Sequence, residues 1–120
     1  MNNIEFNTIV DRFFAFQQKM EATKGKEYAG DTDRLANFKE EAADIGVMPE
    51  TVCHIFLNKH LRSIRSYVKT VQATGQPPTN QSEPFEGRVG DAIVYLMLLY
   101  ALTVEREQIT SENEAIDRGG

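Results

Sequence analysis

The chain has 120 residues, of which 41% are hydrophobic and 26% are charged. This length and composition predict a single globular domain with a core of its own. The formal net charge of -5 argues against general nucleic-acid binding. A single cysteine, Cys53, excludes an internal disulfide, and the amino terminus lacks the pattern of a secretory signal, so we expect a cytoplasmic protein.

Apolar residues recur at intervals of three and four, which is the spacing of helices rather than of strands. A first helix is predicted over about residues 4–23, and glycines then indicate an ordered loop from about 24 to 33. A second helix is predicted over 34–45 and ends at Gly46. A third follows over about 50–73, and prolines make residues 75–81 a loop.

The fourth predicted helix is capped by Ser82 and contains the most apolar stretch of the chain, residues 92–102. Because this stretch is apolar on all sides, we expect a central helix that is buried all round in a soluble core. It is shorter than the roughly 20 apolar residues that span a membrane, so we expect no membrane association. Residues 107–120 are polar and are predicted to fray or to dock on a partner subunit.

Together these segments predict an all-α protein, a bundle of four main helices that forms one domain over residues 1–106, with a polar tail over 107–120. The large apolar residues of the first and fourth helices exceed what a lone unit of this size can hide. We therefore expect a homo-oligomer, at least a dimer.

Polar residues beside this core indicate a site for phosphates. Asn37, Glu41 and Asp44 form a polar stripe along the second helix, and Asp91 enters the apolar fourth helix. Facing carboxylates need a cation, and Mg²⁺ prefers such oxygen ligands. Basic side chains could then hold phosphates and a tyrosine could stack on a base. The candidates for these two roles are Lys24, Lys26, Lys59, Arg88, Tyr28 and Tyr95.

Three segments carry a resemblance to a known family, namely KGKEYAGDTDRLANFKEEA at 24–42, LNKHL at 57–61 and SEPFEGRVGDAIVYL at 82–96. They resemble small phage-type members of the MazG-like, all-α nucleoside triphosphate pyrophosphohydrolase superfamily. The resemblance implies an oligomeric helical bundle that binds Mg²⁺ and cleaves nucleoside triphosphates to monophosphate and pyrophosphate. It assigns Glu41, Asp44 and Asp91 to the acidic motifs, as metal ligands and catalytic residues.

One position departs from the family pattern, because Arg88 stands where the second acidic motif has a carboxylate. A guanidinium binds phosphate directly and makes a metal less necessary. Two functions therefore stay open: a Mg²⁺-dependent nucleotide pyrophosphohydrolase, and a viral protein that sequesters a nucleotide in the host cytoplasm without cutting it. A third and weaker possibility is a helical adaptor that binds a protein partner.

Each candidate also has a purely structural interpretation. Arg88 and Asp91 could form an ion pair at a spacing of three residues, and Glu41 and Asp44 could belong to a solvated face. His60 could be a satisfied core histidine. The basic residues of the third helix could be ordinary surface; they are Lys59, Arg62, Arg65 and Lys69.

Overall fold

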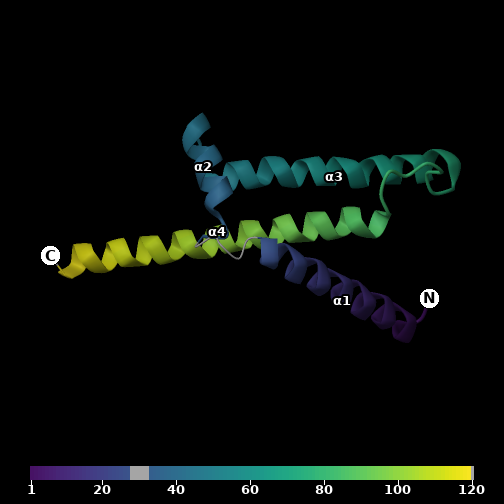
Figure 1. Cartoon of the computed structure of the whole chain (residues 1–120), viewed down its shortest axis with the longest axis horizontal. Helices are drawn as coiled ribbons and strands as arrows, with labels where there is room; N and C mark the ends of the chain where they lie inside the picture. The colour runs from purple at the N-terminus through teal and green to yellow at the C-terminus, as the bar shows by residue number, and fades with distance from the viewer. Residues whose placement is uncertain (28–32, 120) are drawn as a thin grey trace. The chain divides into compact units, whose positions relative to one another are not determined.

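The computed structural model describes residues 1–27 and 33–119, with the side chains of 1–21 and 33–118. These residues form four helices and no strand, which confirms the all-α class (Figure 1). The helices are α1 (Asn3–Glu27), α2 (Ala36–Ile45), α3 (Pro49–Thr74) and α4 (Phe85–Gly119). The chain divides into two compact units, residues 1–34 and 35–120. The single domain predicted over 1–106 stays a prediction, as does the four-helix bundle.

Helix α1 makes up most of the first unit. It begins where the Asn2 side-chain oxygen accepts a hydrogen bond from the backbone N–H of Glu5, at 2.8 Å. It continues to Glu27, so the loop predicted from residue 24 is wrong over 24–27. The glycine at position 25 does not end the helix, because a glycine inside a helix costs only about 1 kcal/mol relative to alanine.

In the second unit α3 runs antiparallel beside α4, and α2 packs against α3 (Figure 1). The core of this unit is small. Its main cluster consists of the buried residues Leu35, Phe38, Ala42, Val52, Cys53 and Leu102, with Tyr95, Leu98 and Leu99 packed against them. Leu57, Ala92 and Val94 are buried as well. The apolar faces predicted for the second and third helices are thus confirmed near Phe38 and Cys53. They extend less far than expected, since Ile45 and Val68 are each 55% exposed.

Two glycines end α2 and α3 as the sequence predicts. Gly46 has a φ of 75° and Gly75 a φ of 69°, in the left-handed region that side chains with a Cβ rarely adopt. The backbone N–H of Gly75 donates to the carbonyl of Val71 at 2.7 Å, which closes the last turn of α3. The chain then returns through residues 75–84 to pair α4 with α3.

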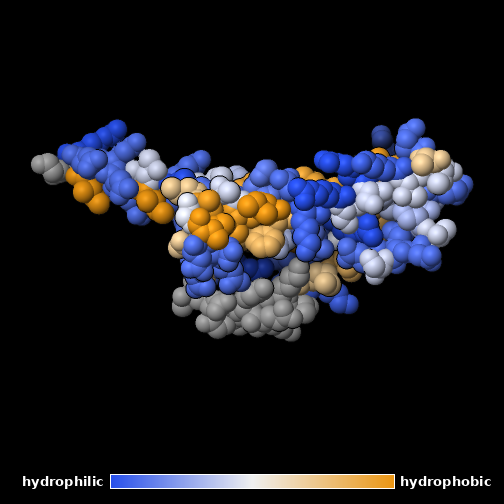
Figure 2. Space-filling model, turned by 90° about the horizontal axis from the view of Figure 1, so that it is seen from above, coloured by the Kyte–Doolittle hydropathy of each residue, from blue (hydrophilic) through white to orange (hydrophobic). Residues whose placement is uncertain are grey.

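Helix α4 differs from prediction at both ends. It begins at Phe85, because the carbonyl of Pro84 accepts the N–H groups of Gly87 and Arg88 and Ser82 lies outside the helix. It continues to Gly119, so residues 107–119 are helical rather than frayed, and their docking on a partner subunit stays a prediction. Residues 105–118 contain neither glycine nor proline, and good helix formers sustain the helix there. Apolar side chains stand among hydrophilic ones on this carboxyl-terminal arm (Figure 2).

The prediction that α4 is buried on every side is also wrong. Leu96 and Met97 are each 50% exposed and Tyr100 is 72% exposed. Within its unit α4 is covered mainly by α3, and near Tyr95 and Leu102 also by residues 35 and 38. By length and composition alone the stretch Phe85–Arg118 could cross a membrane, a test that the core helix of a soluble protein also passes. The expectation of no membrane association stays a prediction, as does the cytoplasmic location.

Candidate functional site at the α3–α4 seam

Arg88 lies in the seam between α3 and α4, with its side chain only 15% exposed. Its Nη1 atom donates a hydrogen bond to the backbone carbonyl of Ser63 at 3.3 Å. Its Nε atom is buried and has no hydrogen-bond partner within the described residues. The Oε1 atom of Glu83 lies 3.8 Å from this Nε, which is ion-pair distance but too long for a hydrogen bond. The guanidinium therefore keeps donor capacity that a closer anion could use.

One turn further along α4, Asp91 lies beside His60 of α3. The Oδ2 atom of Asp91 is 3.8 Å from Nδ1 of His60. The ion pair between Arg88 and Asp91, which was the structural alternative, does not occur among the ion pairs of residues 33–118, since Arg88 faces Glu83 and Asp91 faces His60. Packing against α3 decides this, because the neighbouring helix brings the imidazole to Asp91.

Tyr95 belongs to an aromatic cluster in the core. Its ring stacks on His60 with the centroids 4.9 Å apart. Phe38 and Phe56 also contact it, with centroids 6.3 and 6.0 Å away. A base could stack on Tyr95 only after displacing one of these rings. His60 packs against this cluster with its side chain 23% exposed, so it is partly buried at the edge of the core, and its interpretation as a core histidine stays a prediction.

On the other side of Arg88, Tyr67 of α3 stacks on Phe85 at the start of α4, with centroids 4.0 Å apart. Neither ring was singled out from the sequence as a site residue. The available signal was the position of Phe85 directly after Pro84, where a helix begins. Arg88 thus lies between two stacked pairs, Tyr67 with Phe85 and His60 with Tyr95.

The three predicted carboxylates are not grouped into one cluster by the structure. No three His, Cys, Asp or Glu side chains in the parts of the chain that the structure describes are grouped so that they could hold a metal ion. Helix α2 buries Phe38 and Ala42 and leaves Glu41 and Asp44 exposed, whereas Asp91 faces His60 in the seam. Their assignment as metal ligands and catalytic residues stays a prediction.

The other predicted ligand residues are spread over several places. Asn37 on α2 and Lys59 on α3 are exposed. Lys24, Lys26 and Tyr28 lie outside the residues whose side chains the structure describes. The nucleotide-binding role of these five residues stays a prediction.

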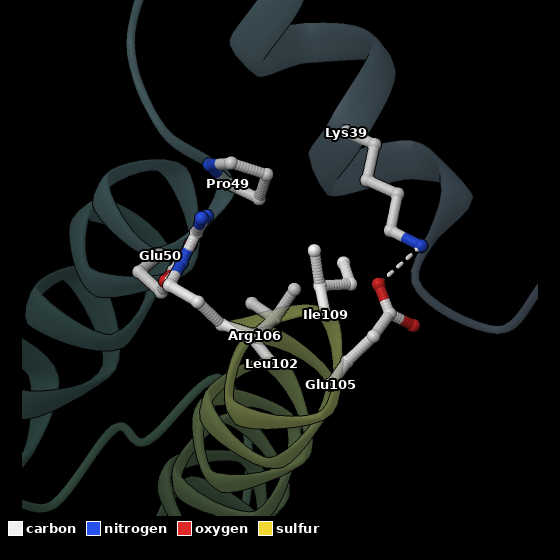
Figure 3. Close-up of a pocket in the computed structure, with 7 residues that line it drawn as sticks. All are labelled: Lys39, Pro49, Glu50, Leu102, Glu105, Arg106 and Ile109. Carbon is white, nitrogen blue, oxygen red and sulfur yellow. Dashed lines mark hydrogen bonds and ion pairs between the residues drawn. The ribbon is translucent and has the colours of Figure 1, made fainter. Parts of the chain in front are cut away.

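A separate small pocket lies where α2, the start of α3 and α4 meet (Figure 3). Its volume is about 140 Å³, and Pro49, Leu102 and Ile109 supply apolar lining. Two ion pairs border it. Lys39 lies 2.6 Å from Glu105, and Arg106 pairs with Glu50. Ligand pockets usually measure roughly 300 to 1,000 Å³, so this one could accept a single apolar side chain but could not enclose a nucleotide.

The ion pair of Glu50 and Arg106 perturbs both groups. The hydrogen bond from Arg106 holds the pKa of Glu50 below its usual value, and the same contact raises the pKa of Arg106. Two of the three guanidinium nitrogens, Nε and Nη2, donate to the carboxylate, with Nη2 donating to Oε1 at 2.7 Å. This two-point contact joins the start of α3 to the middle of α4. Cys53, by contrast, is a buried thiol whose pKa is raised by desolvation, so it is poorly suited to nucleophilic chemistry.

Comparison of the chain with protein-family models, with curated proteins and with solved structures gave no match. The MazG-like resemblance therefore stays a prediction. What the geometry offers is a mostly buried guanidinium in a seam lined by aromatic rings, with one loosely held carboxylate in front of it.

Proposed function

We propose that this protein binds a nucleotide through Arg88 at the α3–α4 seam and does not hydrolyse it. The observation that supports this function is the state of the guanidinium, which has a buried Nε without a hydrogen-bond partner in residues 33–118 and only Glu83 at ion-pair distance. An unmade hydrogen bond of a buried donor costs about 1–3 kcal/mol, and a phosphate oxygen that displaced Glu83 would recover it.

The residues around Arg88 support a nucleotide rather than a simple anion. Aromatic rings lie on both sides of it along the seam, and rings of this kind can stack on a base. Arginine suits this role better than lysine, because its planar fork binds a phosphate at two points. In this proposal Arg88 holds the phosphate, and Tyr67 or Phe85 offers a ring face to the base.

The test is a thermal-shift and calorimetric screen with mono-, di-, tri- and cyclic nucleotides and with inorganic phosphate. A ligand at 100 times its dissociation constant is expected to stabilise the fold by about 2.7 kcal/mol. Arg88→Ala should weaken binding by about 10- to 100-fold. Arg65→Ala is the matched control, because Arg65 is an exposed cation of α3. Equal affinities for the two variants, or no response to any nucleotide, would reject the proposal.

The pyrophosphohydrolase predicted from the resemblance is the second candidate. Glu41 and Asp44 favour it, because both are exposed three residues apart on α2 and are open to solvent. The test is pyrophosphate release from a panel of nucleoside triphosphates with Mg²⁺, with Glu41→Gln as the inactive control. Product formation that Glu41→Gln abolishes would replace the binding-only function, whereas silence at high protein concentration leaves it in place.

A further inference from the structure

Four exposed cations lie along one side of α3. They are Lys59, Arg62, Arg65 and Lys69, and we call them the basic face. At 100° per residue they fall within an arc of about 120°. The side of α3 that meets α4 carries Cys53, His60 and Tyr67, and its centre lies about 160° away around the helix. Within the second unit the basic face is therefore turned away from α4.

The charges of the basic face are separated from the acidic residues of the chain. Residues 51–82 contain no Asp or Glu, although the chain has 18 acidic residues. Elsewhere in the second unit Lys39, Arg88 and Arg106 each face a carboxylate. No ion pair within residues 33–118 involves a member of the basic face. The four charges are thus available to a ligand.

This arrangement weakens the helix that carries it. Successive members of the basic face lie three or four residues apart, so each is beside another cation on the helix surface. Like charges at this spacing destabilise a helix, whereas a carboxylate at the same spacing would stabilise it. Because the four side chains are exposed, the packing of the second unit does not require them to be basic. The pattern therefore indicates an anionic ligand that neutralises them.

We propose that the basic face binds the phosphate backbone of a nucleic-acid duplex, without regard to base sequence. Its members span ten residues of α3, about 15 Å of helix axis. A duplex carries one negative charge per about 1.7 Å of its length, and its major groove of about 12 Å admits an α-helix. The proposal is independent of the nucleotide site on the α4 side of α3. A mononucleotide carries too few phosphates to span the basic face, so Arg65→Ala remains a control for that site.

The side chains around the basic face favour a duplex over other anionic partners. The Phe and Tyr rings of α3, Phe56 and Tyr67, pack against rings of α4 on the other side. The basic face thus has no such ring on which an unpaired base could stack. Ile55 is the large apolar side chain exposed within the same arc, which is too little to insert into a lipid surface. A duplex has a higher charge density than an acidic protein surface, so it releases more counterions for each cation.

The net charge of -5 describes the whole chain and does not decide this local contact. The acidic residues of α4 stand behind α3 as seen from the basic face. A helix is about 10 Å across, which exceeds the Debye length of about 8 Å at physiological ionic strength. Repulsion between these carboxylates and a duplex on the basic face is therefore largely screened.

The experiment measures fluorescence anisotropy of a labelled duplex of about 20 base pairs against the full chain, at several NaCl concentrations from about 20 to 150 mM. Four phosphate contacts predict that the logarithm of the association constant falls with the logarithm of the salt concentration with a slope of about -3.6. Arg62→Gln with Lys69→Gln should reduce the magnitude of this slope to about 1.8 and weaken binding at least about tenfold at low salt.

Arg12→Gln with Arg118→Gln is the matched control, because it removes two exposed cations of α1 and α4. It should leave the slope and the affinity unchanged, and the helical circular dichroism of both double variants should equal that of the unmodified chain. Absence of binding at the lowest salt, or equal slopes for the two double variants, would overturn the proposal. Tighter binding of a single strand, of poly-glutamate or of phosphatidylserine vesicles than of the duplex would overturn the choice of partner.

Discussion

The Nη1 atom of Arg88 donates a hydrogen bond across the seam to the backbone carbonyl of Ser63, 3.3 Å away. Because Ser63 belongs to α3, this hydrogen bond holds the guanidinium in one orientation. The other N–H groups of Arg88 therefore point in a defined direction. Glu83, in the segment before α4, is the carboxylate at ion-pair distance from them, and its side chain is 48% exposed. An anionic ligand of this site therefore competes with a half-exposed carboxylate, which is easily displaced.

Glu83→Gln is expected to strengthen the binding of an anionic nucleotide by up to about fivefold, because it removes the competing charge without removing Arg88. Glu112→Gln, which removes an exposed charge far along α4, is the matched control. Calorimetric titration of the best nucleotide from the screen measures both. A weaker affinity for Glu83→Gln than for the control would show that Glu83 helps to hold the ligand instead.

The contact of Glu50 with Arg106 predicts a pH-dependent stability. The pKa of Glu50 is lowered by the Arg106 hydrogen bond, so the unfolded state binds its proton more readily than the folded state does. The stabilisation is therefore present above the unfolded value of about 4.5 and is lost as the pH falls through the lower folded value. Glu50→Gln should lower the melting temperature at pH 7, and this deficit should shrink as the pH falls below about 4.5. A deficit that is constant with pH would contradict this cause.

Because the core is small, substitutions at two nearby positions of α3 should lower the free energy of unfolding by very different amounts. Leu57 is 5% exposed, whereas Ile55 is 55% exposed. Leu57→Ala should lower the free energy of unfolding by about 2–5 kcal/mol, because it leaves a cavity in the core. Ile55→Ala should change it by no more than about 0.5 kcal/mol, as is usual for exposed sites. Urea unfolding followed by circular dichroism compares the two, and equal losses would place Ile55 in a buried interface.

Substitution by alanine should change the stability of the protein in opposite directions at two glycines. Gly46 ends α2 with a φ of 75° and has no atom within 4 Å of a new Cβ, so Gly46→Ala costs only the left-handed backbone, about 1–2 kcal/mol. Gly87 lies inside α4, and the nearest neighbour of its new Cβ is Glu83 Oε2 at 4.0 Å. Gly87→Ala should therefore stabilise the chain by about 0.4–1 kcal/mol. Thermal melts test both, and destabilisation by Gly87→Ala would indicate a close neighbour from another molecule.

Local sequence patterns were sufficient to predict the helical class, the approximate helices and the glycines that end α2 and α3. These features depend on local helix propensity and on the spacing of apolar residues at three and four, and both can be read directly from the sequence. The same reasoning placed Phe38 and Cys53 in the core correctly, because their neighbours along the helix repeat the pattern. It did not predict that residues 107–119 continue α4, which they can do because residues 107–118 contain neither glycine nor proline.

The meeting of charged groups, in contrast, depends on how the helices pack. Arg88 pairs with Glu83 rather than with Asp91, and Asp91 faces His60, because the register of α3 against α4 sets these distances and the spacing along one helix does not. The pairs of Lys39 with Glu105 and of Glu50 with Arg106 likewise join residues that are distant along the chain. The exposure of Leu96, Met97 and Tyr100 has the same origin. A helix that is apolar all round has to be covered on each side by another element, and within its unit α4 is covered on one side, mainly by α3.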